Sequence, residues 1–177
     1  MRRNCALLLA ALLALLVLPV RAAEGAELAV DSRVLTGEEE TVTLAVTLTG
    51  GTDNCGGGFI LWYDSLCLEL TELEAGPALD GAVTAANPAL GDGVAKLSWA
   101  SVTPLVGEGV AARATFRVLS REASQVELLN AELLDQSGAA LPLRVVNGTV
   151  GLEDEPEPSP TPAPETGGEP ERPQGGS

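Results

Sequence analysis

Histidine is absent from the 177-residue chain, and this limits the chemistry that its side chains can perform. Histidine is the usual general base near neutral pH and the commonest metal ligand, so Ser-His and Cys-His pairs are excluded. Carboxylates are plentiful, but no spacing places two of them across a cleft, as glycoside cleavage requires. Asp53, Asn54 and Asp92 also lack the spaced oxygen ligands of a calcium loop. We therefore expect no enzymatic activity, no cofactor and no metal site.

Cys55 and Cys67 lie on either side of a predicted strand. The third cysteine of the sequence, Cys5, lies in a predicted signal peptide, so the mature chain would keep two, and an even number of cysteines in an exported chain suggests a disulfide. A strand of five or six residues, however, separates its ends by about 17–20 Å, whereas a disulfide needs Cα atoms within about 7 Å. Cys67 also falls at an apolar strand position, where a buried thiol behaves as a small hydrophobe. The sequence therefore predicts two free cysteines.

The N-terminus has the pattern of a secretory signal peptide. Arg2 and Arg3 precede an apolar run at residues 6–18, and Val20 and Ala22 suit the small positions of a cleavage site. The run is shorter than the stretch of about 20 apolar residues that spans a bilayer. Residues 1–22 are therefore predicted to be removed on secretion, with no membrane insertion afterwards.

The charge of the chain excludes several kinds of partner. It has 25 acidic and 10 basic residues, and removal of Arg2, Arg3 and Arg21 leaves seven basic residues and a net charge of −18. Nucleic acids and anionic membranes are bound by basic patches, so neither is an expected partner. An acidic chain instead suits solubility in an extracellular medium.

Short alternating segments separated by glycine-rich turns predict an all-β fold. Val42, Leu44 and Val46 alternate with threonine and alanine, which is the two-residue period of a half-buried strand. The predicted strands cover residues 27–32, 40–48, 58–63, 67–73, 94–100, 110–119, 125–134 and 143–150, although 125–134 also fits a helical face. Such spacing favours two packed antiparallel sheets in a β-sandwich or jelly roll. The predicted core comprises Val42, Leu44, Val46, Phe59, Leu61, Tyr63, Phe116 and Val118.

Two further segments complete the organisation of the chain. Residues 152–177 alternate proline with acidic and small residues, a composition that predicts a disordered acidic Pro-rich tail. Residues 23–151 then form the one folded domain. Within it, Trp62 is the aromatic ring on the outward side of its strand, whereas the side of Trp99 is left open. An outward ring could stack on a sugar, so a carbohydrate-binding module is one candidate function.

Several motifs also occur in an order typical of one family. They are Phe59-Ile-Leu-Trp-Tyr-Asp64, Trp99-Ala-Ser101, residues 104–110, Thr115-Phe-Arg-Val118 and residues 141–150. Taken together, they resemble the cohesin domain, the receptor module with which scaffold proteins of bacterial cellulosomes capture dockerin-bearing enzymes. The resemblance implies a two-sheet jelly-roll β-sandwich of about nine strands. It also implies that one sheet face receives the dockerin.

The resemblance further implies which residues bind the partner. It assigns to the binding face the strand from Gly56 to Trp62 and the loop at residues 104–109, with Arg113 and Thr115 on a strand beside Ile60 and Trp62. Gly56 and Gly58 depart from the family, whose characterised members carry polar contact residues there. The full predicted set is Gly56, Gly58, Ile60, Trp62, Leu105, Glu108, Gly109, Arg113 and Thr115.

The predicted function is thus that of a secreted, non-catalytic recognition module for a dockerin on a polysaccharide-degrading enzyme. The alternatives are a carbohydrate-binding module, with a polysaccharide as partner, and a cohesin-fold adhesion or structural module without a dockerin partner.

Overall fold

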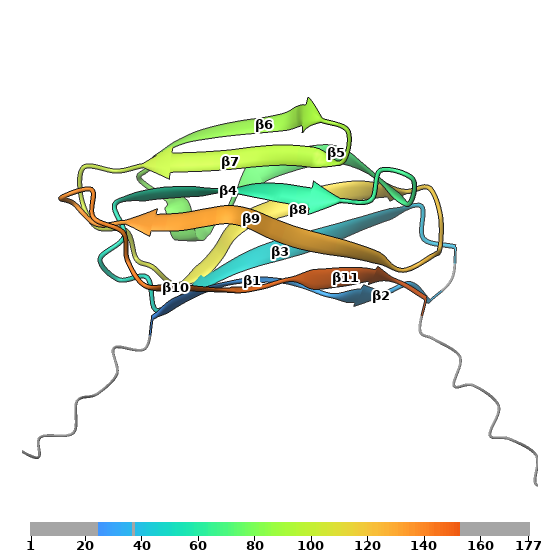
Figure 1. The fold of residues 1–177 in the computed structure, drawn as a ribbon, viewed down its shortest axis with the longest axis horizontal. Helices are drawn as coiled ribbons and strands as arrows, with labels where there is room; N and C mark the ends of the chain where they lie inside the picture. Colours follow the sequence, from blue (N-terminus) through green and yellow to red (C-terminus); the bar gives the residue numbers. More distant parts are fainter. Residues whose placement is uncertain (1–24, 37, 153–177) are drawn as a thin grey trace, which may run out of the picture.

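The computed structural model describes residues 25–36 and 38–152, which form a β-sandwich (Figure 1). The predicted signal peptide and nearly all of the predicted tail lie outside these residues. A short 3-10 turn, η1 (Pro77–Leu79), follows the fifth strand. The strands of the described part are β1 (Ala26–Val30), β2 (Arg33–Val34), β3 (Thr41–Thr49), β4 (Gly56–Tyr63), β5 (Leu68–Ala75), β6 (Val83–Gly91), β7 (Val94–Ala100), β8 (Gly109–Val118), β9 (Ser124–Leu134), β10 (Leu143–Val146) and β11 (Gly148–Gly151).

The strands form two sheets that pack face to face. The five-stranded sheet, here the β8 sheet, has the order β10-β1-β3-β8-β5, and the six-stranded sheet, here the β4 sheet, has the order β2-β11-β9-β4-β7-β6. This confirms the predicted all-β, two-sheet sandwich. The prediction of purely antiparallel sheets is wrong, because β10 and β11 return beside β1 and β2 and run parallel to them.

The core lies between the two sheets and follows the predicted alternation. Along β3, Val42, Leu44, Val46 and Leu48 are buried while the intervening side chains face outward. The predicted core is confirmed except at Val118, which is only partly buried because β8 ends at this residue.

Two aromatic pairs strengthen this core. The rings of Tyr63 and Phe116 meet edge to face across the two sheets, with centroids 5.1 Å apart. Within the β4 sheet, the rings of Phe59 and Trp99 also meet edge to face, with centroids 6.3 Å apart, and Trp99 is buried. Trp99 therefore belongs to the core. Tyr63 is also buried, and this burial raises the pKa of its phenol.

Two differences from the predicted strands have local causes. β6 was not predicted because Pro88 interrupts it and its small residues show no apolar alternation, yet its backbone pairs with β7 from Val83 to Asn87. The predicted strand at 143–150 is divided at Asn147, whose side-chain Oδ1 accepts a hydrogen bond from the Leu128 N–H at 3.1 Å. The ambiguous segment at 125–134 is a strand, β9.

Cys55 and Cys67, the two cysteines among the described residues, are buried free thiols, as predicted. Cys55 precedes β4 and Cys67 follows it, so the length of that strand lies between them. Burial raises the pKa of the Cys67 thiol, and the neighbouring Asp64 carboxylate raises it further.

Candidate recognition face

The outer face of the β4 sheet consists of cross-strand rows of side chains. β4 lies between β7 and β9, and paired residues in antiparallel strands present their side chains on the same face. Leu61 on β4 is fully buried and Trp62 is 38% exposed, which identifies the outward set. From the pairings of β6, β7, β4 and β9, the outward rows are Val83, Ala100, Gly56 and Leu134; Ala85, Ser98, Gly58 and Glu132; Asn87, Lys96, Ile60 and Leu129; and Val94, Trp62 and Glu127.

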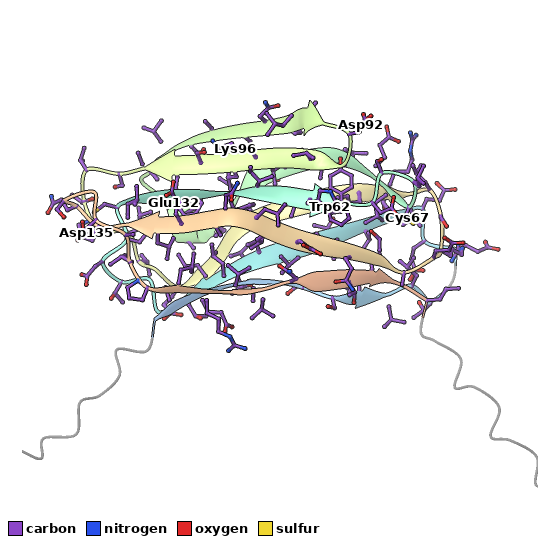
Figure 2. All side chains as sticks on the ribbon, in the orientation of Figure 1. Trp62, Cys67, Asp92, Lys96, Glu132 and Asp135 are labelled. Atoms are coloured by element: carbon purple, nitrogen blue, oxygen red, sulfur yellow. The ribbon has the colours of Figure 1, made fainter. Side chains whose placement is uncertain are left out.

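An apolar cluster, which we call the Trp62 patch, occupies one half of this face. Trp62 pairs with Val94, and Ile60 pairs with Leu129, which is 41% exposed. Directly opposed side chains have Cβ atoms about 4.5–5.5 Å apart, so these four residues form one continuous surface. Figure 2 labels Trp62 on β4, with Lys96 on β7 and Glu132 near β9. Trp62 and Ile60 thus face outward, as predicted.

The charged residues of this face are few: Lys96 and Glu127 flank the Trp62 patch, and Glu132 lies beside Gly58 in the other half. Lys96 is paired across the strands with Ile60, and Glu127 with Trp62. In the part of the chain that the structure describes, the ion pairs within 4 Å are Arg117 with Glu69 and Arg144 with Glu27, both on the other sheet. The outer face of the β4 sheet is therefore an apolar patch with a sparse polar border.

The other half of the face is almost without side chains on β4. Gly56 and Gly58 occupy outward positions, as predicted, but both are buried by their neighbours. A Cβ at Gly58 would lie 2.8 Å from the Leu97 carbonyl oxygen, whereas one at Gly56 would have ordinary contacts of 3.4 Å or more. Gly58 is thus required by the close approach of β4 and β7.

Buried Asn54 fixes the start of β4. Its Oδ1 accepts a hydrogen bond from the Gly56 N–H at 3.1 Å and one from the Trp99 indole N–H at 3.5 Å. A Cβ at Gly57 would lie 2.8 Å from the Trp99 ring, so the indole packs directly on the strand backbone. The glycine half of the face is therefore held in place by the buried hydrogen bonds of Asn54, which the sequence prediction did not include.

Arg113 and Thr115 do not lie on this face, and their predicted place beside Ile60 and Trp62 is wrong. Both belong to β8, which pairs with β3 and β5 in the other sheet. Thr115 Oγ1 lies 3.0 Å from Thr43 Oγ1 on the outer side of that sheet. The reason is topological, because the connection after β7 crosses from one sheet to the other.

The loop at residues 101–108 closes one end of the sandwich. Leu105 is buried, and its N–H donates to the Asn54 carbonyl oxygen at 2.8 Å, so its side chain anchors the loop and cannot contact a partner. Glu108 Oε1 accepts a hydrogen bond from the Gly50 N–H at 3.0 Å. Gly109 is exposed with φ 109° at the start of β8. Leu105 is therefore excluded from the candidate face. Gly109 pairs with Leu48 of β3 in the β8 sheet, and Glu108 is bonded to Gly50 directly after β3, so their predicted place on the face of Trp62 is also wrong.

An open cavity of about 480 Å³ adjoins this loop and includes Asp53, Pro104 and Asp135 in its lining. Asp135 Oδ1 accepts hydrogen bonds from the Ser137 hydroxyl at 2.7 Å and the Ala139 N–H at 2.9 Å. These bonds stabilise the carboxylate and lower the pKa of Asp135. No cluster of three metal-ligating side chains occurs within residues 25–36 and 38–152.

Several residues of the face were missed by the sequence prediction. Val94, Lys96 and Leu129 lie on strands that were predicted, and their alternation could have assigned them outward positions. Their adjacency to Trp62 and Ile60 could not be predicted, because it depends on which strands pair. None of the described residues forms a helix long and apolar enough to cross a bilayer.

Comparison with known proteins supports one fold. No family model and no curated protein matches the sequence. Among solved structures, the sixth cohesin of scaffoldin B from Acetivibrio cellulolyticus, in complex with a Cel5 dockerin, is 21% identical, with a TM-score of 0.61, over 73% of this chain and 99% of that one. A type III cohesin of the cell-surface anchoring scaffoldin ScaE from Ruminococcus flavefaciens is 16% identical, with a TM-score of 0.66, over 77% of this chain and 93% of that one.

A third similar structure comes from an archaeon. It is a non-cellulosomal cohesin from Archaeoglobus fulgidus, 18% identical, with a TM-score of 0.64, over 75% of this chain and 94% of that one. At these identities the likeness concerns the fold alone. The described residues therefore have a cohesin-like fold.

Proposed function

We propose that the protein is an exported, non-catalytic recognition module that binds a dockerin through the outer face of its β4 sheet. The Trp62 patch is the observation that carries this proposal. It is an exposed apolar cluster on a sheet face with few charges, in a domain whose fold is that of cohesins. Solved neighbours from Acetivibrio cellulolyticus and Clostridium thermocellum are complexes of a cohesin with a dockerin.

The two outer faces of the sandwich differ in a way that supports this choice. The β8 sheet presents threonines together with Arg113, Arg117, Glu72 and Glu74, and the Arg117 and Glu69 side chains form an ion pair with each other. This face is thus polar, with charged side chains among its threonines, whereas the outer face of the β4 sheet has an exposed apolar patch. Exposed tryptophan bordered by polar groups is instead typical of interface centres, where it supplies much of the binding energy.

The glycines at the other end of the face determine how a partner would bind there. Gly56 and Gly58 have no side chains that could donate hydrogen bonds, so this end can offer only backbone groups and its neighbours Ser98 and Glu132. We therefore place the main contact at the Trp62 patch. The same glycines favour a second candidate, a cohesin-fold module whose partner is not a dockerin, and a non-cellulosomal cohesin is among the structural neighbours.

A capture experiment tests the proposal. The full secreted chain is immobilised and exposed to the culture supernatant of its own organism, with the Trp62→Ala variant as the matched control. We expect captured proteins to carry dockerin modules, identified by mass spectrometry, and to be depleted on the variant. Capture of proteins without dockerins would favour the second candidate, and retention by polysaccharide alone would favour a carbohydrate-binding module.

Export is tested separately. We expect the protein in the medium to begin at Ala23, as determined by N-terminal sequencing. A chain retained in the cell with its first 22 residues intact would contradict the predicted signal peptide.

A further inference from the structure

β6 is an unusual edge strand. It ends the β4 sheet, and all nine of its residues, Val83–Gly91, are exposed. The other three strands at sheet edges carry charged residues: Arg144 on β10, Arg33 on β2, and Glu69, Glu72 and Glu74 on β5. β6 has no charged residue, although charged residues make up 20% of the chain.

This difference matters because an edge strand has unpaired backbone N–H and C=O groups. Proteins usually protect such edges from pairing with another strand by charged side chains, proline or irregularity. In β6 the protection is limited to one half, since Pro88 lacks an N–H and the pairing with β7 becomes irregular after Asn87. The half from Val83 to Asn87 is regular, exposed and unprotected.

We propose that β6 pairs with β6 of a second copy of this chain, antiparallel, about a two-fold axis through Ala85. This register uses the whole unprotected half and places Pro88 outside the paired segment. It opposes Ala85 to Ala85, Thr84 to Ala86, and Val83 to Asn87 of the second copy. None of these pairs brings like charges together, and each residue of the segment finds a partner of small or moderate size.

A second copy suits this edge better than an unrelated extended peptide. Strand addition gains specificity from pockets that accept alternate side chains of the peptide, and the short side chains of Thr84, Ala85 and Ala86 do not build such pockets. The chain is also strongly acidic, with a net charge of −15, so two copies repel each other over most of their surface. An uncharged edge is where that repulsion is weakest.

The dimer would have two recognisable properties. Continuous antiparallel pairing keeps corresponding sheet faces on the same side, so the two Trp62 patches would point in one direction. β5 lies close to β6 and carries Glu72 and Glu74, which brings acidic groups of the two copies toward each other. The association should therefore be transient and should strengthen as salt concentration rises, because salt screens this repulsion.

Sedimentation equilibrium of the full secreted chain tests the proposal, and the test does not depend on the proposed function. Over protein concentrations from about 10 μM to about 1 mM, we expect the average mass to rise from monomer toward dimer. We expect Ala85→Lys and Ala85→Glu each to remain monomeric, because two like charges then meet at the axis. An equimolar mixture of the two variants should recover the dimer, and Ala139→Lys, on an exposed turn away from β6, should behave as the unmodified chain.

Three results would overturn the inference. One is a monomer at every concentration. Another is dimerisation of Ala85→Lys equal to that of the unmodified chain, which would place the contact elsewhere. The last is dimerisation that weakens with added NaCl, which would indicate an interface built on opposite charges.

Discussion

Leu61 and Trp62 are neighbours in the sequence but lie on opposite faces of β4, so truncating each should affect a different property. Leu61 is fully buried in the core, and Trp62 is 38% exposed within the Trp62 patch. We expect Leu61→Ala to lower the stability of the domain and Trp62→Ala to lower its affinity for a partner. The pair therefore tests both the register of β4 and the assignment of the recognition face.

The magnitude for Leu61 follows from its burial. Removing a fully buried leucine side chain costs about 2–5 kcal/mol, because transfer energy is lost and a cavity remains. Leu61 pairs with Ala95 on one side and Leu128 on the other, and all three residues are buried. Exposed side chains therefore cannot move in to fill much of the cavity. We expect the upper half of this range.

The magnitude for Trp62 is smaller for folding and larger for binding. On an exposed sheet face its loss removes mainly cross-strand contacts with Val94 and Glu127, worth about 0.2–1 kcal/mol per pair. At an interface, truncation of a central tryptophan commonly costs about 2 kcal/mol or more. This corresponds to a loss of affinity of about 30-fold for the dockerin recovered by capture.

Urea unfolding followed by tryptophan fluorescence provides the stability measurement. Trp99 is buried and is present in both variants, so it reports unfolding even when Trp62 is absent. With an m-value of about 2 kcal/mol per molar urea, Leu61→Ala should lower the midpoint by about 1.8–2.5 M, and Trp62→Ala, which loses two cross-strand contacts, by at most about 1 M. Isothermal titration calorimetry with the captured dockerin provides the affinities.

The reasoning fails in two distinguishable ways. If Trp62→Ala unfolds the domain and Leu61→Ala has no effect, then Trp62 points into the core and Leu61 points outward, and the register of β4 is off by one residue. If Trp62→Ala changes neither stability nor affinity, the fold description stands but the partner binds elsewhere.

Three further predictions concern the rest of the domain. Gly58→Ala should destabilise by about 1–3 kcal/mol, because its Cβ would collide with the Leu97 carbonyl, whereas Gly56→Ala should change stability by less than about 1 kcal/mol; equal urea midpoints would contradict the close approach. Cys55 and Cys67 should resist a thiol reagent in the native state and both react after denaturation without reductant, and a bridge found by peptide mapping would disprove this. The pKa of Asp135 is lower in the folded than in the unfolded state, so its contribution to stability is present above the unfolded pKa and is lost as pH falls through the folded value. On acid titration, the stability of Asp135→Asn should therefore fall less steeply than that of the unmodified chain.

The sequence was sufficient to predict the layers and the core, because both depend on local alternation. Val42, Leu44 and Val46 alternate with threonines, and this pattern assigns each residue to a side without knowledge of any neighbour. The same local argument gave outward positions for Ile60 and Trp62, and separated Cys55 from Cys67 by the length of a strand.

Adjacency between strands could not be predicted in the same way. Arg113 and Thr115 were placed beside Trp62 although β8 belongs to the other sheet, because alternation says nothing about which strand is next. β6 was missed since Val83–Gly91 has no apolar alternation to mark it and forms only by pairing with β7. The residues that complete the Trp62 patch, Val94 and Leu129, become visible only once that pairing is known.

The positions of the two ends of the domain bear on how it would respond to a pulling force. The start of β1 and the end of β11 lie toward opposite ends of the long axis (Figure 1). β1 is bonded on one side to β10 and on the other to β3, while β11 is bonded to β9 and β2. Tension applied between the ends would slide these strands along their neighbours, so both hydrogen-bonded ladders of a strand must break together rather than one bond after another. β4 and β7, which carry Trp62, Ile60 and Val94, are bonded to neither β1 nor β11, so three of the four residues of the Trp62 patch lie on strands that the load does not reach directly, whereas Leu129 lies on β9, the neighbour of β11.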